Sequence, residues 1–149
     1  MVTTSSTRDE RIAETAGRLR LAIVRTARRM RQEAGTGLSP TLIAALATID
    51  RHGPLTPSEL ADAERVKRPT ATRIAAALER DGLIRRAADP ADGRACLLSA
   101  SREGRALLKR VRSRKNAYIS RRLRKLGDDD VETLERAAEV LERMLEDPA

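Results

Sequence analysis

Residues 55–82, "LTPSELADAERVKRPTATRIAAALERDG", decide the fold. Thr56 can cap a helix, and Glu59 stands three residues after it, which is the spacing of a capping box. Pro69 is tolerated only in the first turn of a helix, so a second helix begins close to it and ends at Gly82. Two helices joined by a short turn predict a helix-turn-helix.

The start of the second helix is crowded with groups that favour anions. They are Lys67, Arg68, Thr70, Thr72 and Arg73, and Pro69 among them removes a donor that would otherwise be orphaned. If this helix enters a DNA major groove, its N-terminal residues reach base edges and its free N–H groups face phosphate. The alternative is an ordinary solvated helix start. We interpret these residues as the DNA-reading surface because of the segment that follows them.

A β-hairpin is predicted directly after Gly82. Residues 83–88 and 94–100 are short candidate strands, and the turn-forming cluster "DPADG" separates them. Arg86 and Arg94 make the hairpin basic, and a basic loop can lie in a narrow minor groove. Asp92 is expected either to hold the Arg94 guanidinium by pairing with it or to shape the turn.

Long helices flank this central unit. Residues 1–7 are expected to be a disordered tail, and residues 8–36 repeat apolar side chains at the helical period. Residues 37–100 form the predicted DNA-binding domain, and residues 101–149 form two further helices. Such amphipathic helices at both ends of a small chain favour pairing with a second copy, so a symmetric homodimer is our hypothesis.

Composition limits the class of protein. The chain has 149 residues, 40% of them hydrophobic, with a formal net charge of +8. A small basic chain favours nucleic acid, an anionic membrane surface or acidic partners. No segment has the length of a membrane span, and the N-terminus lacks the apolar block of a signal peptide. One cysteine rules out an internal disulfide, so a cytoplasmic location is expected.

The sequence offers no chemistry for an enzyme. One His and one Cys provide neither a zinc site nor a nucleophilic triad, so no metal and no cofactor are expected. Cys96 lies in a predicted strand, where we interpret it as a small buried hydrophobe.

Charge is unevenly distributed over the last third of the chain. Residues 101–126 hold eleven Lys or Arg against one acid, whereas residues 127–149 hold nine acids against two Arg. We interpret the cationic helix as a solvated face that complements the acidic last helix of the same or of the other subunit.

Residues 55–104 resemble the winged helix-turn-helix of the MarR family of bacterial transcription regulators. The matching motifs are "LT-x-x-ELA", "T-x-T-R-I-x-x-x-L-E-x-x-G-L-I-x-R", the wing "D-P-x-D-x-R" and a Ser-x-x-Gly helix start. Two features depart from the family: Gly93 stands where a second arginine is frequent, and Ala100 with Ser101 replaces Leu-Thr.

The resemblance implies a homodimer with intertwined terminal helices that binds double-stranded DNA at a pseudo-palindromic operator. It places Lys67 to Arg73 on the recognition helix and Asp92 and Arg94 on the wing. It also implies release by a small aromatic or phenolic effector, for which the sequence names no pocket.

The predicted fold is therefore mainly α with a small β-hairpin wing, a winged helix-turn-helix between dimerisation helices. The predicted function is a DNA-binding transcriptional regulator, most simply a repressor. Two alternatives remain: a non-specific architectural DNA-binding protein, and a basic protein-interaction module.

Overall fold

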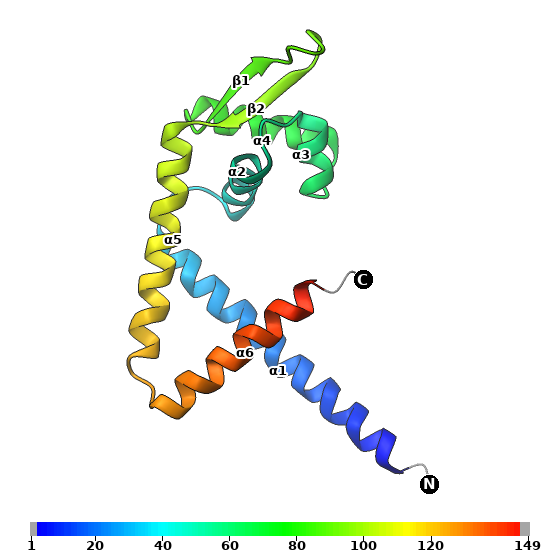
Figure 1. Cartoon of the computed structure of the whole chain (residues 1–149), viewed down its shortest axis with the longest axis vertical. Helices are drawn as coiled ribbons and strands as arrows, with labels where there is room; N and C mark the ends of the chain where they lie inside the picture. Colours follow the sequence, from blue (N-terminus) through cyan, green and yellow to red (C-terminus); the bar gives the residue numbers. More distant parts are fainter. Residues whose placement is uncertain (1–2, 147–149) are drawn as a thin grey trace.

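The computed structural model describes the backbone of residues 3–146, and side chains from residue 7 onward. Its helices are α1 (Thr3–Ala34), α2 (Pro40–His52), α3 (Pro57–Ala63), α4 (Arg68–Arg80), α5 (Arg102–Leu123) and α6 (Asp128–Glu146), and its strands are β1 (Ile84–Ala88) and β2 (Cys96–Ala100). The predicted fold, mainly α with a two-stranded wing, is confirmed (Figure 1).

The tail prediction was wrong where it can be judged. Residues 3–7 belong to α1, so the helix begins five residues earlier than expected. Residues 1–2 lie outside the described part of the chain.

The hydrophobic core lies in the lobe that α2, α3, α4 and the hairpin form together. Leu46, Leu60 and Leu98 are completely buried there, and they come from α2, α3 and β2. Full burial of one such side chain stabilises the fold by about 1.5–3 kcal/mol. The lobe therefore has a core of its own, formed without aromatic residues.

Side-chain caps begin three of the described helices, and the sequence predicts the one at Thr56. Ser39 Oγ accepts a hydrogen bond from Leu42 N at 3.3 Å. Thr56 Oγ1 accepts from Glu59 N at 3.2 Å, while Thr56 N donates to the Glu59 carboxylate at 2.7 Å, so the capping box is confirmed. Such a cap contributes about 1 kcal/mol and fixes where the helix starts.

The wing is anchored to the core through β2. The two strands are antiparallel, with Ile84 opposite Ala100 and Arg86 opposite Leu98. Leu55 forms an isolated bridge with Leu98, which adds a third, very short strand position beside the hairpin. Because Leu98 is buried and bonded on both sides, the base of the wing is held firmly against α2 and α3.

The start of α5 packs very closely against the lobe. Ser101 Oγ accepts from Gly104 N at 3.0 Å and donates to the Gly82 carbonyl at 2.6 Å. A Cβ on Gly104 would lie 2.1 Å from Leu83 O and 3.1 Å from Leu46 Cδ1. The Ser-x-x-Gly spacing therefore serves both the cap and the close approach of helix and core.

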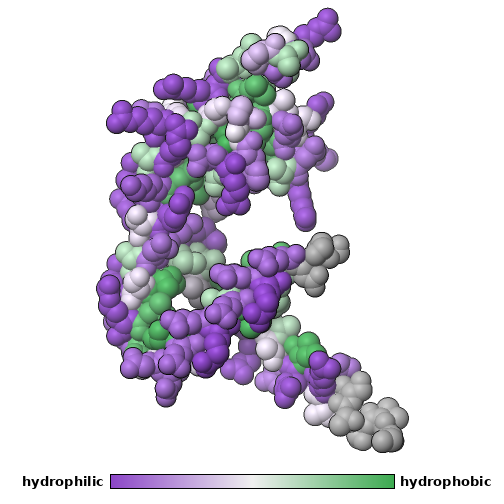
Figure 2. Space-filling model, in the orientation of Figure 1, coloured by the Kyte–Doolittle hydropathy of each residue, from purple (hydrophilic) through white to green (hydrophobic). Residues whose placement is uncertain are grey.

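The outer helices leave apolar surface uncovered. α1 packs on α5, where Arg114 Nη1 donates to the Ala34 carbonyl at 2.7 Å. Nearer the N-terminus of α1, Ile12 and Val24 are 54% and 53% exposed. α6 buries none of its described residues. Figure 1 shows both helices extending away from the core lobe, and Figure 2 shows hydrophobic residues at the surface of this lower part of the molecule.

Candidate nucleic-acid interface

A tight turn places α4 against α3. Arg65 has φ of 53°, the left-handed conformation that non-glycine residues adopt rarely. Its N–H donates to the Asp62 carbonyl at 3.2 Å, and Val66 N donates to the Ala61 carbonyl at 2.9 Å. These bonds end α3 and redirect the chain, so the connection between the two helices is short and tightly bonded.

The two faces of α4 differ completely in burial. Ala71, Ile74, Ala75 and Leu78 are 0–7% exposed and pack into the core. On the other side, the residues that the sequence singled out are exposed: Lys67, Arg68, Pro69, Thr72 and Arg73. Thr70 lies between the two faces and is half-buried. The polar start of the helix is therefore presented to solvent.

The N-terminus of α4 has no side-chain cap. Lys67 is the cap residue and makes no capping hydrogen bond with its side chain, although its carbonyl accepts from Thr70 N and Ala71 N. The uncapped N–H end carries the positive end of the helix dipole. A phosphate that approaches this turn meets both the dipole and the adjacent cations.

Two of the polar groups on α4 are already positioned by the protein. Arg68 donates from Nε and Nη2 to Ser58 Oγ of α3, at 3.1 and 2.8 Å. Thr72 Oγ1 donates to the Arg68 carbonyl at 3.0 Å. Among the described residues, Lys67 and Arg73 have no hydrogen-bond or ion-pair partner for their side chains. They are the two cations of α4's first turns that are available to an external ligand.

The wing turn is shaped by aspartate side chains. Asp92 Oδ1 accepts from Arg94 N at 3.0 Å, and Asp89 Oδ1 accepts from Ala91 N at 2.9 Å. Within the described residues no ion pair joins Asp92 to the Arg94 guanidinium. Of the two roles expected for Asp92, the structure therefore has the second, shaping the turn, and it leaves the Arg94 side chain exposed.

Arg86 is held against α4. It lies on β1, where its Nε pairs with the Glu79 carboxylate at 3.1 Å and its Nη1 donates to Cys96 Sγ at 3.5 Å. Partial burial works against its charge, but the bonds to Cys96 and Glu79 prevail and raise the pKa of Arg86 above its usual value. Unlike Arg94, Arg86 already holds two partners within the protein.

Some residues that shape this surface were missed from the sequence. Ser58 positions Arg68, Glu79 holds Arg86, and Arg65 makes the turn. Positions 58 and 68, or 79 and 86, come together only through tertiary packing, so no local pattern identifies the pairs. The predicted buried role of Cys96 is only partly met, because its side chain is half-buried.

Other kinds of site are not found in residues 3–146. No group of three or more His, Cys, Asp or Glu there could hold a metal ion. No described helix combines the length and the apolar character that a membrane span requires.

Comparison with known proteins agrees with this geometry. The model of the MarR family matches residues 38–96. The chain is 34% identical over 136 residues to an HTH-type transcriptional regulator of Mycobacterium leprae, covering 91% of this chain and 95% of that protein.

Solved structures share the fold. A transcriptional regulator from Pseudomonas aeruginosa has a TM-score of 0.84 and 32% identity, over 93% of this chain and 98% of that one. A single-site mutant of MepR from Staphylococcus aureus, bound to an oligodeoxyribonucleotide, has a TM-score of 0.70 at 19% identity, over 88% and 97% of the two chains.

Proposed function

The chain belongs to the MarR family of transcription regulators, and on that premise we propose that it is a homodimeric repressor of a pseudo-palindromic operator. It has the DNA-binding helix-turn-helix fold and is a regulator, not an enzyme. As a regulator of chromosomal DNA, it would act in the bacterial cytoplasm.

One observation carries the proposal: α4 buries its apolar face and turns an uncapped, cationic N-terminus outward. The major groove accommodates one helix, and short polar side chains at its start reach base edges. Lys67, Thr70 and Arg73 are proposed to contact the half-site, with Arg68 and Thr72 beside them. The wing would add Arg94 in the neighbouring minor groove.

The homodimer is supported by the surface that the outer helices leave uncovered. In α1, Leu21 and Ile23 are 42% and 47% exposed, and in α6, Met144 and Leu145 are 61% and 86% exposed. Apolar surface of this extent in a small protein is typical of an interface between subunits. A two-fold dimer would present two α4 helices to successive major grooves, about 34 Å apart.

Footprinting on the DNA that co-purifies with the protein tests this function. We expect a protected inverted repeat whose two halves are one helical turn, about 10 base pairs, apart. Uniform protection of any sequence would favour the architectural alternative, and no binding to DNA would favour the interaction module. Repression, as opposed to activation, requires that the protected repeat overlap the promoter and that its transcription fall when the protein is added.

Release by a small effector is proposed for the cavity between α1, α2 and α5. Its volume is about 810 Å³, and its walls are largely apolar, with Leu38, Ile43 and Val111 among them. Arg28 and Lys115 also line it, so an aromatic or phenolic anion matches its chemistry. A ligand there would favour a spacing of the α4 helices that no longer fits the grooves. The same footprint, repeated with benzoate present, should then fade.

Arg94→Ala is expected to weaken DNA binding and lower its salt dependence. If Arg94 contacts one phosphate per half-site, the slope of log K against log salt should fall by about one for each wing. Operator preference should change little, because a phosphate contact carries no sequence information. Fluorescence anisotropy over a salt series measures the slope, and a slope equal to that of wild type would remove Arg94 from the interface.

A further inference from the structure

α6 carries two neighbouring bands of side chains, none of which is fully buried by its own chain. The apolar band, spaced at three and four residues, holds Val131, Leu134, Ala138, Leu141 and Leu145. The acidic band, one position further along at each step, holds Glu132, Glu135, Glu139, Glu142 and Glu146. Such spacing places each band along one side of the helix. Within residues 3–146, the one ion pair of the acidic band joins Glu132 to Arg136 at 3.7 Å.

The C-terminal part of α5 and the turn after it carry the reciprocal pattern. Ile119, Leu123 and Leu126 share one side, and Leu126 is 42% exposed. Tyr118, Arg122 and Lys125 form the adjacent band. An apolar strip with a basic border thus stands on the end of α5 and the turn after it, and an apolar strip with an acidic border stands on α6. Bordering charges of this kind select the partner of a packed helix.

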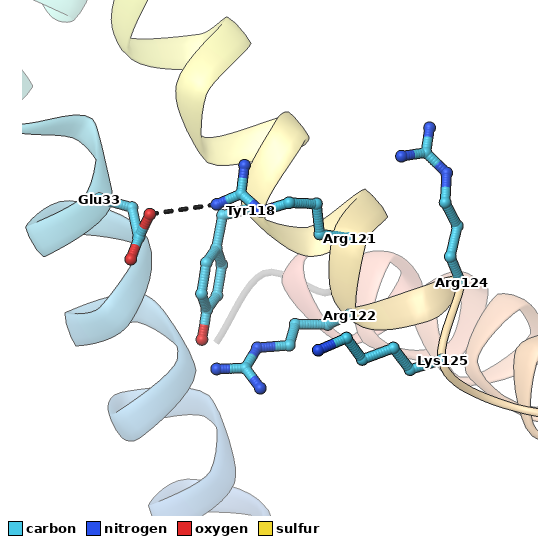
Figure 3. A pocket seen from close by; sticks show the side chains of 6 residues that line it. All are labelled: Glu33, Tyr118, Arg121, Arg122, Arg124 and Lys125. Atoms are coloured by element: carbon cyan, nitrogen blue, oxygen red, sulfur yellow. Dashed lines mark hydrogen bonds and ion pairs between the residues drawn. The ribbon is translucent and has the colours of Figure 1, made fainter.

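The basic border of α5 lines a hollow of about 460 Å³ beside α1 (Figure 3). Glu33, the one carboxylate in its lining, is paired with Arg121 at 3.1 Å. The Arg122 guanidinium lies 5.4 Å from the centre of the Tyr118 ring, and Lys125 has no polar partner among the described residues. Figure 3 shows Arg122 and Lys125 directed toward the Tyr118 hydroxyl, so two positive charges gather there without a counter-ion among the described residues.

The helix that could neutralise these charges is directed away from them. α6 follows α5 through a short turn at Gly127 and then diverges, so the two helices share no extensive packing (Figure 1). Charge complementarity between α5 and α6 therefore cannot be realised within one chain. The α6 of a second copy is not joined to this α5 through the Gly127 turn. It can therefore approach the basic border in an orientation that the chain's own α6 cannot take.

We propose that α6 of a second copy lies on this surface, with its acidic band against Arg122 and Lys125 and its apolar band on Ile119, Leu123 and Leu126. The proposal rests on the homodimer proposed above and names the surface and the charges that hold it. Such a contact would make dimerisation weaker at high ionic strength, because partly exposed charge pairs are screened by salt.

A charge exchange between subunits tests the contact. One variant reverses α6 (Glu135→Lys with Glu142→Lys), and the other reverses α5 (Arg122→Glu with Lys125→Glu). Each homodimer then opposes like charges at both contacts, so its dissociation constant at low salt should rise about tenfold or more. Mixing the two variants gives one contact of lysine with glutamate and one wild-type contact. The heterodimer, detected with two affinity tags, should form with nearly wild-type affinity.

A third variant carries all four substitutions in one chain. Together with the mixture, it shows whether the charges pair within one chain or between two chains. Its homodimer should be restored, since both contacts are again complementary. If this variant is restored but the mixture is not, the charges pair within one chain and the proposal is wrong. If the α5 reversal weakens the dimer while the α6 reversal does not, the hollow receives another anion, and the proposal is also wrong.

A matched control changes the net charge by the same amount as the α6 reversal, without touching α6 or α5. Asp50→Lys with Asp62→Lys reverses two exposed acids of α2 and α3 and should leave dimerisation within about twofold of wild type. Circular dichroism of every variant establishes that it is folded. A wild-type chain that is monomeric in sedimentation would contradict the homodimer itself, whereas a dimer insensitive to salt and to both reversals would contradict only the charge contact.

Discussion

Arg73→Ala is expected to abolish the protein's preference for its operator. Arg73 lies on the exposed face of α4, one turn after its uncapped start, and no partner among the described residues holds its guanidinium. A bidentate contact between arginine and guanine is worth about 1–3 kcal/mol of discrimination. Because the proposed dimer uses the residue twice, operator affinity should fall about a hundredfold, while binding to random DNA falls much less. Competition gel shifts against non-specific DNA measure the ratio.

Arg80→Ala is the matched control for this change. Arg80 is on the same helix but at its C-terminal end, where its side chain is 77% exposed and its Nε pairs with Asp81 Oδ1 at 3.7 Å. This variant removes the same charge from α4 at a position outside the proposed groove contact. It should therefore bind the operator within about threefold of wild type. Equal losses for Arg73→Ala and Arg80→Ala would mean that α4 contributes only general charge.

Gly104→Ala is expected to produce the largest loss of stability. The added Cβ would lie 2.1 Å from Leu83 O, and a backbone carbonyl cannot move aside as the end of a flexible side chain can. Separating α5 from the lobe would also disturb the Ser101 cap. We expect the free energy of unfolding to fall by about 3 kcal/mol, which urea denaturation at fixed protein concentration measures.

Gly93→Ala controls for the substitution itself. Apart from Gly93 itself and its two chain neighbours, no heavy atom lies within 4 Å of the position that its Cβ would take. Its stability should therefore stay within about 0.5 kcal/mol of wild type. If Gly104→Ala were as stable as Gly93→Ala, the result would contradict the close contact between Gly104 and the Leu83 carbonyl.

The sequence predicted the parts of the fold that depend on local rules. Thr56 with Glu59, Pro69 and Gly82 determine where α3 and α4 begin or end, and each acts through its own backbone or an immediate neighbour. The turn-forming cluster "DPADG" correctly predicted the hairpin whose two strands form the wing. Lys67 and Arg73, which the sequence singled out at the start of α4, are exposed.

What the sequence could not predict depends on tertiary contact. The commitment of Arg86 to Glu79 requires the wing to fold back onto α4, and no spacing rule encodes that distance. The sequence also left open whether the acids of the last helix neutralise the cations of the same subunit. Helical periodicity gives the bands on α5 and α6 but not the angle between the two helices, and that angle separates them.

α5 is an uninterrupted helix that connects the core lobe with the outer helices. It is a single helix of 22 residues, about 33 Å long, held by the lobe at Gly104 and by α1 at Arg114. A tilt of about 6° at one end displaces the other by about 3.4 Å, the rise of one base step. In the proposed dimer, a rotation of this size where the subunits meet would move each α4 by about one base step along the DNA.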